Sequence, residues 1–279
     1  MDNRIAEKFS QLAKRGERAL ICYVVAGYPD IATTKQVVDA LVHGGADMIE
    51  VGIPFSDPIA DGPTIQAASN IALKKGMTPE KALNLVRAVR KKHPSLPMLA
   101  MTYSNILVRA GIEKFMYDSK QCGLDGFILP DLPVEEADMY TAVALKLNLA
   151  TVFLVSPNTP DRRLRKIVAT TTGFLYLVSV YGITGARNSF QNYTLNTIRV
   201  VKHMSGGKVP LAVGFGISRP SHAKIMIRAG AEAIIIGSAI VNKISNGSGT
   251  EMLIDLQNFA ESMKKACRSS RTKHINASS

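Results

Sequence analysis

Cysteine is scarce in this sequence of 279 residues. The three cysteines, Cys22, Cys122 and Cys267, are odd in number and show no CxxC spacing. This pattern favours reduced, buried thiols over a disulfide framework or a zinc site. The five histidines also lack the spacing of metal ligands, so we expect no metal site.

Long apolar runs are also missing. No run reaches the roughly 18–20 residues that a membrane-spanning helix needs. The N-terminal stretch, MDNRIAEKFSQLAKRG, is amphipathic and contains Asp2 and Glu7, so it lacks the apolar core of a secretory signal. We therefore expect a cytoplasmic protein without a membrane association.

The charge balance is basic, with a formal net charge of +12. Part of this charge is local, because the chain ends in the basic, serine-containing stretch KKACRSSRTKH. No interleaved aromatic and basic residues and no RNA-binding signature accompany it. The charge therefore predicts attraction for anionic metabolites rather than a nucleic-acid partner.

A short apolar run, a loop rich in Gly, Pro and Asp, and an amphipathic helical segment repeat eight times along the chain. Strands that are apolar throughout and alternate with helices indicate a parallel sheet covered by helices. An open, doubly wound sheet is the alternative, but no GxGxxG motif follows the first run. We predict an α/β fold, a single-domain (β/α)8 TIM barrel over residues 1–268, with a basic, flexible tail over 269–279. The expected strands are residues 19–27, 47–52, 97–105, 125–131, 150–156, 174–180, 209–216 and 232–238, preceded by an extra helix at about 3–15 and followed by one near 250–267.

Acidic residues stand out in the stretch IEVGIPFSDPIADGP, residues 49–63. Side chains alternate along a strand, so Glu50 would point into the barrel near the end where barrel enzymes carry their active sites. A buried carboxylate has a raised pKa and can transfer protons, unless a Lys or Arg pairs with it. Asp61 follows on a proline-rich loop, where it could be a second functional carboxylate or the N-cap of the next helix. Asp57 is a turn residue or a surface contact.

Glycine-rich strand exits cluster late in the chain, in YGITGARNS, GFGISRP and GSAIV. Backbone N–H groups in such turns and at helix N-termini bind phosphate, and barrels often do so after their last two strands. Gly216, Gly237 and Ser238 fall there. The alternative is that these glycines only permit tight turns, while the long segment YGITGARNSFQNY suits a closing lid.

These residues resemble the tryptophan synthase α subunit family. The family signature is present without a break in IEVGIPFSDPIADGP, and the resemblance spans all of the chain except the basic tail. Further matches are AGYP (26–29), MTYSN (101–105), PDLPVEE (130–136), GITGAR (182–187), GFGIS (214–218) and GSAIV (237–241). Ser104 and Ile106 depart from the family, which more often has an aromatic residue and a proline there.

The resemblance implies a lyase that cleaves indole-3-glycerol phosphate by a retro-aldol reaction to indole and glyceraldehyde 3-phosphate. Glu50 would be the acid/base, and Asp61 would hold the indole N–H and offset positive charge on the ring. Tyr176 and Thr184 would orient Glu50 and Asp61 respectively. The remaining substrate-binding residues implied are Tyr23, Ile65, Met101, Tyr103 and Phe215 around the indole, and Gly185, Gly216, Gly237 and Ser238 around the phosphate.

The resemblance also implies a partner, the β subunit of tryptophan synthase, in an α2β2 heterotetramer. Pyridoxal phosphate would belong to that partner, and this chain would need no cofactor. The loops at 53–62 and 180–193 would close over the site, with Pro54 and Asp57 touching the β subunit. Two alternatives remain: a stand-alone indole-releasing lyase, and a catalytically silent subunit that only activates its partner.

Overall fold

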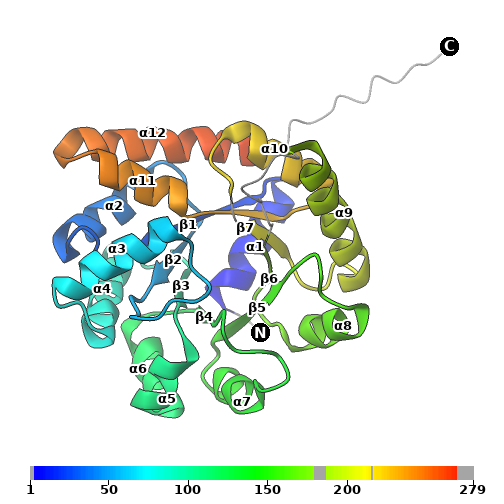
Figure 1. Ribbon diagram of the computed structural model, residues 1–279, viewed down its shortest axis with the longest axis horizontal. Helices are drawn as coiled ribbons and strands as arrows, with labels where there is room; N and C mark the ends of the chain where they lie inside the picture. The colour runs from blue at the N-terminus through cyan, green and yellow to red at the C-terminus, as the bar shows by residue number, and fades with distance from the viewer. Residues whose placement is uncertain (1–2, 179–186, 215, 269–279) are drawn as a thin grey trace.

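Eight parallel strands form a closed barrel in the computed structural model, which describes residues 3–178, 187–214 and 216–268. Each strand pairs with the next one in the chain, and β8 closes the ring by pairing with β1 (Figure 1). This closure confirms the predicted (β/α)8 barrel and excludes an open, doubly wound sheet. The strands are β1 (Ala19–Val25), β2 (Met48–Gly52), β3 (Met98–Met101), β4 (Gly126–Ile128), β5 (Ala150–Val155), β6 (Leu175–Val178), β7 (Leu211–Gly214) and β8 (Ala233–Ile236).

Helices form a ring outside the strands, and α1 lies instead over the centre of the barrel (Figure 1). The apolar side chains of α1, among them Ile5 and Leu12, pack against residues inside the barrel. They close the barrel at the N-terminal ends of its strands, which we call the lower end. The helices are α1 (Arg4–Lys14), α2 (Ile31–His43), α3 (Pro63–Lys74), α4 (Pro79–Lys92), α5 (Ser104–Ala110), α6 (Ile112–Cys122), α7 (Asp138–Lys146), α8 (Asp161–Thr170), α9 (Arg187–Ser205), α10 (Pro220–Ala229), α11 (Ser238–Asn246) and α12 (Gly249–Cys267).

The two faces of each strand belong to two separate apolar clusters. On β2, Ile49 and Val51 pack against the outer helices, whereas Met48 belongs to the cluster inside the barrel. Glu50 shares the inward face with Met48 and is fully buried. The alternation of the sequence therefore predicts correctly which side of the barrel each β2 side chain occupies.

Buried ion pairs fix the N-terminal ends of the strands. Asp47, just before β2, accepts the Leu20 N–H at 2.8 Å and pairs with Lys264 of α12 at 2.9 Å. Asp125, just before β4, pairs with Arg4 and Arg90, each at 2.8 Å. Because these charges are satisfied at the lower end, the opposite end of the barrel is the one free to carry functional groups.

Several predicted boundaries extend too far. The apolar run at 97–105 continues past β3, but the strand ends at Met101 because α5 begins at Ser104. The predicted boundary at residue 268 stays a prediction, since the tail at 269–279 lies outside the described residues. All three cysteines are buried and unpaired.

Two features are absent from the part of the chain that the structure describes. There, no helix has the length and apolarity to cross a membrane. The same residues contain no group of three or more His, Cys, Asp or Glu side chains placed to hold a metal ion.

Candidate active site

A cavity of about 240 Å³ opens at the C-terminal ends of the strands. Inward-pointing residues of five strands form its floor and walls, and the loops after β2, β7 and β8 form its rim. Its lining contains two carboxylates and several apolar or aromatic side chains, but no Lys or Arg from the described part of the chain. The lining residues are Tyr23, Glu50, Asp61, Gly62, Ile65, Met101, Tyr176, Gly216, Ile217, Ser218, Ile235, Gly237, Ser238, Ala239 and Asn242.

Glu50 is a fully buried carboxyl group without a partner. Neither of its oxygens has a hydrogen bond to any residue that the structure describes, so the alternative of a paired, structural Glu is wrong within those residues. Burial, and then the nearby charge of Asp61, raises the pKa of Glu50 to about 8. At neutral pH the group therefore carries a proton that it can donate.

Asp61 lies on the loop between β2 and α3 and faces the same cavity. Burial raises the pKa of Asp61 to about 6, although a hydrogen bond from Tyr103 works in the opposite direction. The alternative role as an N-cap is wrong, because the N-cap of α3 is Gly62 and no side chain caps that helix. At neutral pH the two carboxyl groups thus differ: Glu50 is mostly protonated and Asp61 is mostly ionised.

Two tyrosines cross the cavity, and a glycine on the neighbouring strand makes room for each. A Cβ atom on Gly52 would lie 2.1 Å from the Tyr23 hydroxyl, and one on Gly214 would lie 2.6 Å from the Tyr176 hydroxyl. Tyr176 lines the cavity opposite Glu50 without a hydrogen bond to it. The Tyr23 ring lines the cavity where the resemblance implies a wall for the indole. Tyr176, which the resemblance implies as the residue that orients Glu50, lines the cavity as well but does not make that hydrogen bond.

The far end of the cavity is built from the loops after β7 and β8. Gly216 has a positive φ of 70°, a conformation that favours glycine, and Ser238 begins α11 directly after Gly237. The N-cap of α11 is Gly237, which has no side chain to cap the helix, and the first two residues of α11 line the cavity. This end suits an anion that is held by main-chain N–H groups.

Sequence reasoning missed two polar residues at this end, Ser218 and Asn242, which also line the cavity. Their positions carried a usable signal. Ser218 lies two residues after Gly216, and Asn242 lies one helical turn after Ser238, where an i, i+4 pair shares one face of a helix.

Tyr103 is not among the residues that line the cavity, although it is predicted to bind substrate. It is 3% exposed, and it lies beneath the loop that carries Asp61. Its hydroxyl accepts a hydrogen bond from the Ala60 N–H at 3.1 Å, and its ring stacks on Phe55 with centroids 5.1 Å apart.

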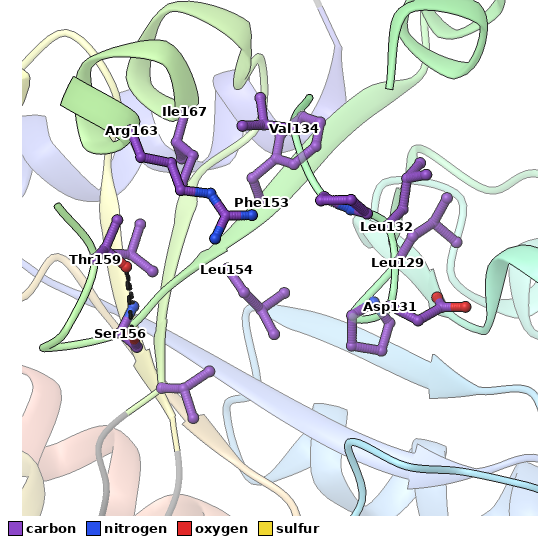
Figure 2. Close-up of a pocket in the computed structure, with 14 residues that line it drawn as sticks. Leu129, Asp131, Leu132, Val134, Phe153, Leu154, Ser156, Thr159, Arg163 and Ile167 are labelled. Atoms are coloured by element: carbon purple, nitrogen blue, oxygen red, sulfur yellow. Dashed lines mark hydrogen bonds between the residues drawn. The ribbon is translucent and has the colours of Figure 1, made fainter. Parts of the chain in front are cut away.

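A second, larger cavity of about 490 Å³ lies at the same end of the barrel, between the loops after β4 and β5 (Figure 2). Its charged lining residues are Asp131 and Arg163. Figure 2 shows the Asp131 carboxylate turned away from Arg163. Asp131 accepts hydrogen bonds from Ser104, and Arg163 pairs with Glu135. Because both charges are satisfied, the described residues of this cavity offer no free acid or base.

The family model described as "Tryptophan synthase alpha chain" matches residues 9–268. This chain belongs to the tryptophan synthase alpha chain family. Alpha chains from Methanosarcina acetivorans and Prochlorococcus marinus are 46% and 42% identical to it, covering 88% and 95% of this chain and 88% and 99% of their own.

Solved structures of the family have the same fold. The tryptophan synthase alpha chain from Legionella pneumophila superposes with a TM-score of 0.87 at 33% identity, covering 98% of this chain and all of that one. An aminoacrylate-bound tryptophan synthase from Mycobacterium tuberculosis gives a TM-score of 0.84 at 31% identity, covering 96% and 100%.

The structure brings together most of the residues that resemblance to the alpha-chain family implies. Glu50 and Asp61 share one cavity with the two tyrosines and with the phosphate-end residues Gly216, Gly237 and Ser238. Ile65 and Met101 also line it. Thr184, Gly185 and Phe215, like residues 180–186 of the expected lid, lie outside the described residues.

The two residues that resemblance to the alpha-chain family places at a subunit contact differ in exposure. Asp57 is exposed, whereas Pro54 is buried. Next to them Ile59 is 82% exposed, which is unusual for so apolar a side chain. Pro54 nevertheless lines a groove that also contains the exposed side chain of Val108.

Proposed function

We propose that this chain cleaves indole-3-glycerol phosphate to indole and D-glyceraldehyde 3-phosphate, as the alpha component of tryptophan synthase in tryptophan biosynthesis. One observation carries the proposal: two carboxyl groups, one of them fully buried and without a hydrogen bond to any described residue, face one aromatic-walled cavity. The far end of that cavity is suited to an anion. Family membership supports the same reaction.

Glu50 moves the protons in this mechanism. Its protonated carboxyl donates to C3 of the indole ring, which converts the ring to a cation whose charge lies largely on the ring nitrogen. The carboxylate that results then removes the proton of the side-chain hydroxyl next to the ring. As that O–H bond breaks, a carbonyl forms, the C–C bond to C3 breaks, and the electron pair returns to the ring. Glu50 ends protonated, as it began.

Asp61 stabilises the charge that this sequence creates. Its ionised carboxylate would accept the hydrogen bond of the indole N–H, which becomes more acidic as the ring becomes cationic. The interaction therefore strengthens between substrate and transition state, as catalysis requires. Tyr23, Ile65, Met101 and Tyr176 would hold the ring between the two carboxyl groups.

The phosphate would bind at the opposite end through N–H groups of Gly216 and Gly237 and through Ser238, where α11 begins. We include Thr184, Gly185 and Phe215 as binding residues on the strength of the family resemblance alone. Ser218 and Asn242 add two side-chain donors at this end.

The family name supports a beta-chain partner, which we propose forms an α2β2 heterotetramer with this chain in the cytoplasm. Pyridoxal phosphate would belong to the partner, which receives the indole, and this half-reaction would use side chains of this chain alone. The complete synthase is a carbon–oxygen lyase. Exposed Asp57 and Ile59, with the groove at Pro54 and Val108, would form part of the contact.

Indole release from indole-3-glycerol phosphate tests the proposal, measured with and without a tryptophan synthase beta subunit. We expect slow release by the chain alone and faster release with the partner. Glu50→Gln, which keeps the shape of the side chain and removes its titrating proton, should abolish release in both cases. High activity that a beta subunit leaves unchanged would indicate a stand-alone lyase. Release that survives Glu50→Gln undiminished would refute the mechanism.

A further inference from the structure

Asp61 reaches the cavity from a loop rather than from a strand, so something must hold its side chain. The loop backbone has its own hydrogen bonds: the Asp61 N–H donates to Pro58 O at 3.0 Å, and Gln66 donates to Asp61 O at 2.8 Å. Neither bond involves the carboxylate. With Ile59 82% exposed, the loop also has little apolar packing at its tip.

Tyr103 supports this loop at two points. Its ring stacks on Phe55 near the start of the loop, with an angle of 27° between the ring planes. Its hydroxyl accepts the Ala60 N–H at 3.1 Å, on the residue directly before Asp61, and it lies near enough to the Asp61 carboxylate to lower the pKa of that group. One buried phenol thus fixes the loop backbone directly before Asp61 and stands beside its carboxylate.

Asp131 in turn holds the backbone next to Tyr103. Both carboxylate oxygens of Asp131, on the loop after β4, accept the Ser104 N–H at 3.0 Å, and Oδ2 accepts the Ser104 hydroxyl at 2.6 Å. Tyr103 is the N-cap of α5 and its own side chain makes no capping bond, so Asp131 takes over that function from a different loop. Hydrogen bonds to a charged acceptor are stronger than neutral ones.

We propose that Tyr103, locked in place by the hydrogen bonds between Asp131 and Ser104, is a positioning residue that holds Asp61 in its catalytic orientation. Tyr103 acts through Asp61 and does not itself touch the substrate, in contrast to the binding role that the sequence predicts. The expected effect on kcat rests on the proposed function. The expected effect on the position of Asp61 depends only on the contacts described above.

The groups around Asp61 determine how its pKa should respond to the loss of the Tyr103 hydroxyl. The titratable groups that face it are Glu50 on β2, Tyr23 on β1, Tyr176 on β6 and Tyr103. Among the described residues that line the cavity there is no cation to stabilise its ionised form. Removal of the Tyr103 hydroxyl should therefore raise the pKa of Asp61 and allow the side chain to turn away.

Tyr103→Phe tests this inference because the ring and its stacking on Phe55 remain. We expect kcat for indole release to fall roughly tenfold, because the loop that carries Asp61 loses the hydrogen bond of the Ala60 N–H. The acidic limb of the pH profile should move to higher pH. Ser104→Ala, which removes only the hydroxyl bond to Asp131, should give a smaller fall in kcat. Ser104→Thr keeps a hydroxyl at this position and should behave like the wild type. Tyr140→Phe is the matched control, since Tyr140 is equally buried at 3% exposure and its hydroxyl donates to Phe127 O, away from Asp61.

A second readout separates this inference from the proposed function. Carbon-13 NMR titration of labelled aspartate carboxyls, with Asp61→Asn to assign the signal, gives the pKa of Asp61 without any substrate. An upward shift in Tyr103→Phe but not in Tyr140→Phe supports the positioning role, even if the wild type releases no indole. An unchanged Asp61 pKa, or an active enzyme whose kcat and pH profile survive Tyr103→Phe, would overturn it.

Discussion

Glu50→Gln should make the fold more stable at alkaline pH while it removes activity. Glu50 has a pKa of about 8 in the folded chain against 4.5 for an unperturbed Glu. Between these values the folded state binds the proton more tightly than the unfolded state does, so stability falls as the pH rises through this range. Glutamine does not titrate and escapes this loss.

The size of the effect follows from the pKa change. One pKa unit corresponds to about 1.4 kcal/mol, so the rise from 4.5 to about 8 sets an upper limit of about 5 kcal/mol. We expect between about 2 and 5 kcal/mol, since local relaxation around a buried charge lowers its cost.

Urea unfolding of both proteins at about pH 5, 7 and 9 measures this quantity. Groups away from the cavity titrate alike in the two proteins, so the difference between their free energies of unfolding reports Glu50 together with its coupling to Asp61, Tyr23 and Tyr176. It should grow in favour of Glu50→Gln as the pH rises. A difference that is constant with pH would show that folding leaves the pKa of Glu50 unchanged, and it would refute the reasoning.

Two further substitutions test the support of the site. Lys264→Met leaves Asp47 buried without its cation, and we expect about 3–5 kcal/mol of destabilisation in urea unfolding; a loss below about 1 kcal/mol would contradict the buried ion pair. Gly52→Ala would place a Cβ atom 2.1 Å from the Tyr23 hydroxyl and push that ring into the cavity. It should raise KM for indole-3-glycerol phosphate by tenfold or more, and an unchanged KM would show that the ring does not bound the site.

The sequence predicts the barrel and the orientation of Glu50 because both depend on local periodicity. Apolar runs of strand length recur with helices between them. The alternation of side chains along β2 places Glu50 inside the barrel, and this placement does not depend on the conformation of the loops. Strand ends are predicted less well. Thr102 and Tyr103 continue the buried run beyond β3, although the chain there already turns into α5.

The role of Tyr103 could not be predicted in this way. Its hydroxyl meets Ala60 from 43 residues away, and Ser104 meets Asp131 across 27 residues. Such contacts depend on how neighbouring βα loops pack, and no local pattern in the sequence encodes that packing. The local sequence around Asp61 also fits an N-cap, because an aspartate shortly before a helix is typical of one. In the structure Gly62 is the N-cap of α3, and the Asp61 carboxylate faces the cavity.

The pH dependence of kcat/KM for indole release, measured on the complex with a beta subunit, tests the central claim most directly. Activity needs Asp61 ionised and Glu50 protonated, so kcat/KM should rise through about pH 6, fall through about pH 8 and be highest near pH 7. Glu50→Gln should leave no such profile to measure. A kcat/KM that keeps rising above pH 8 would show that the reaction needs the ionised form of Glu50 from the start, and would contradict the account.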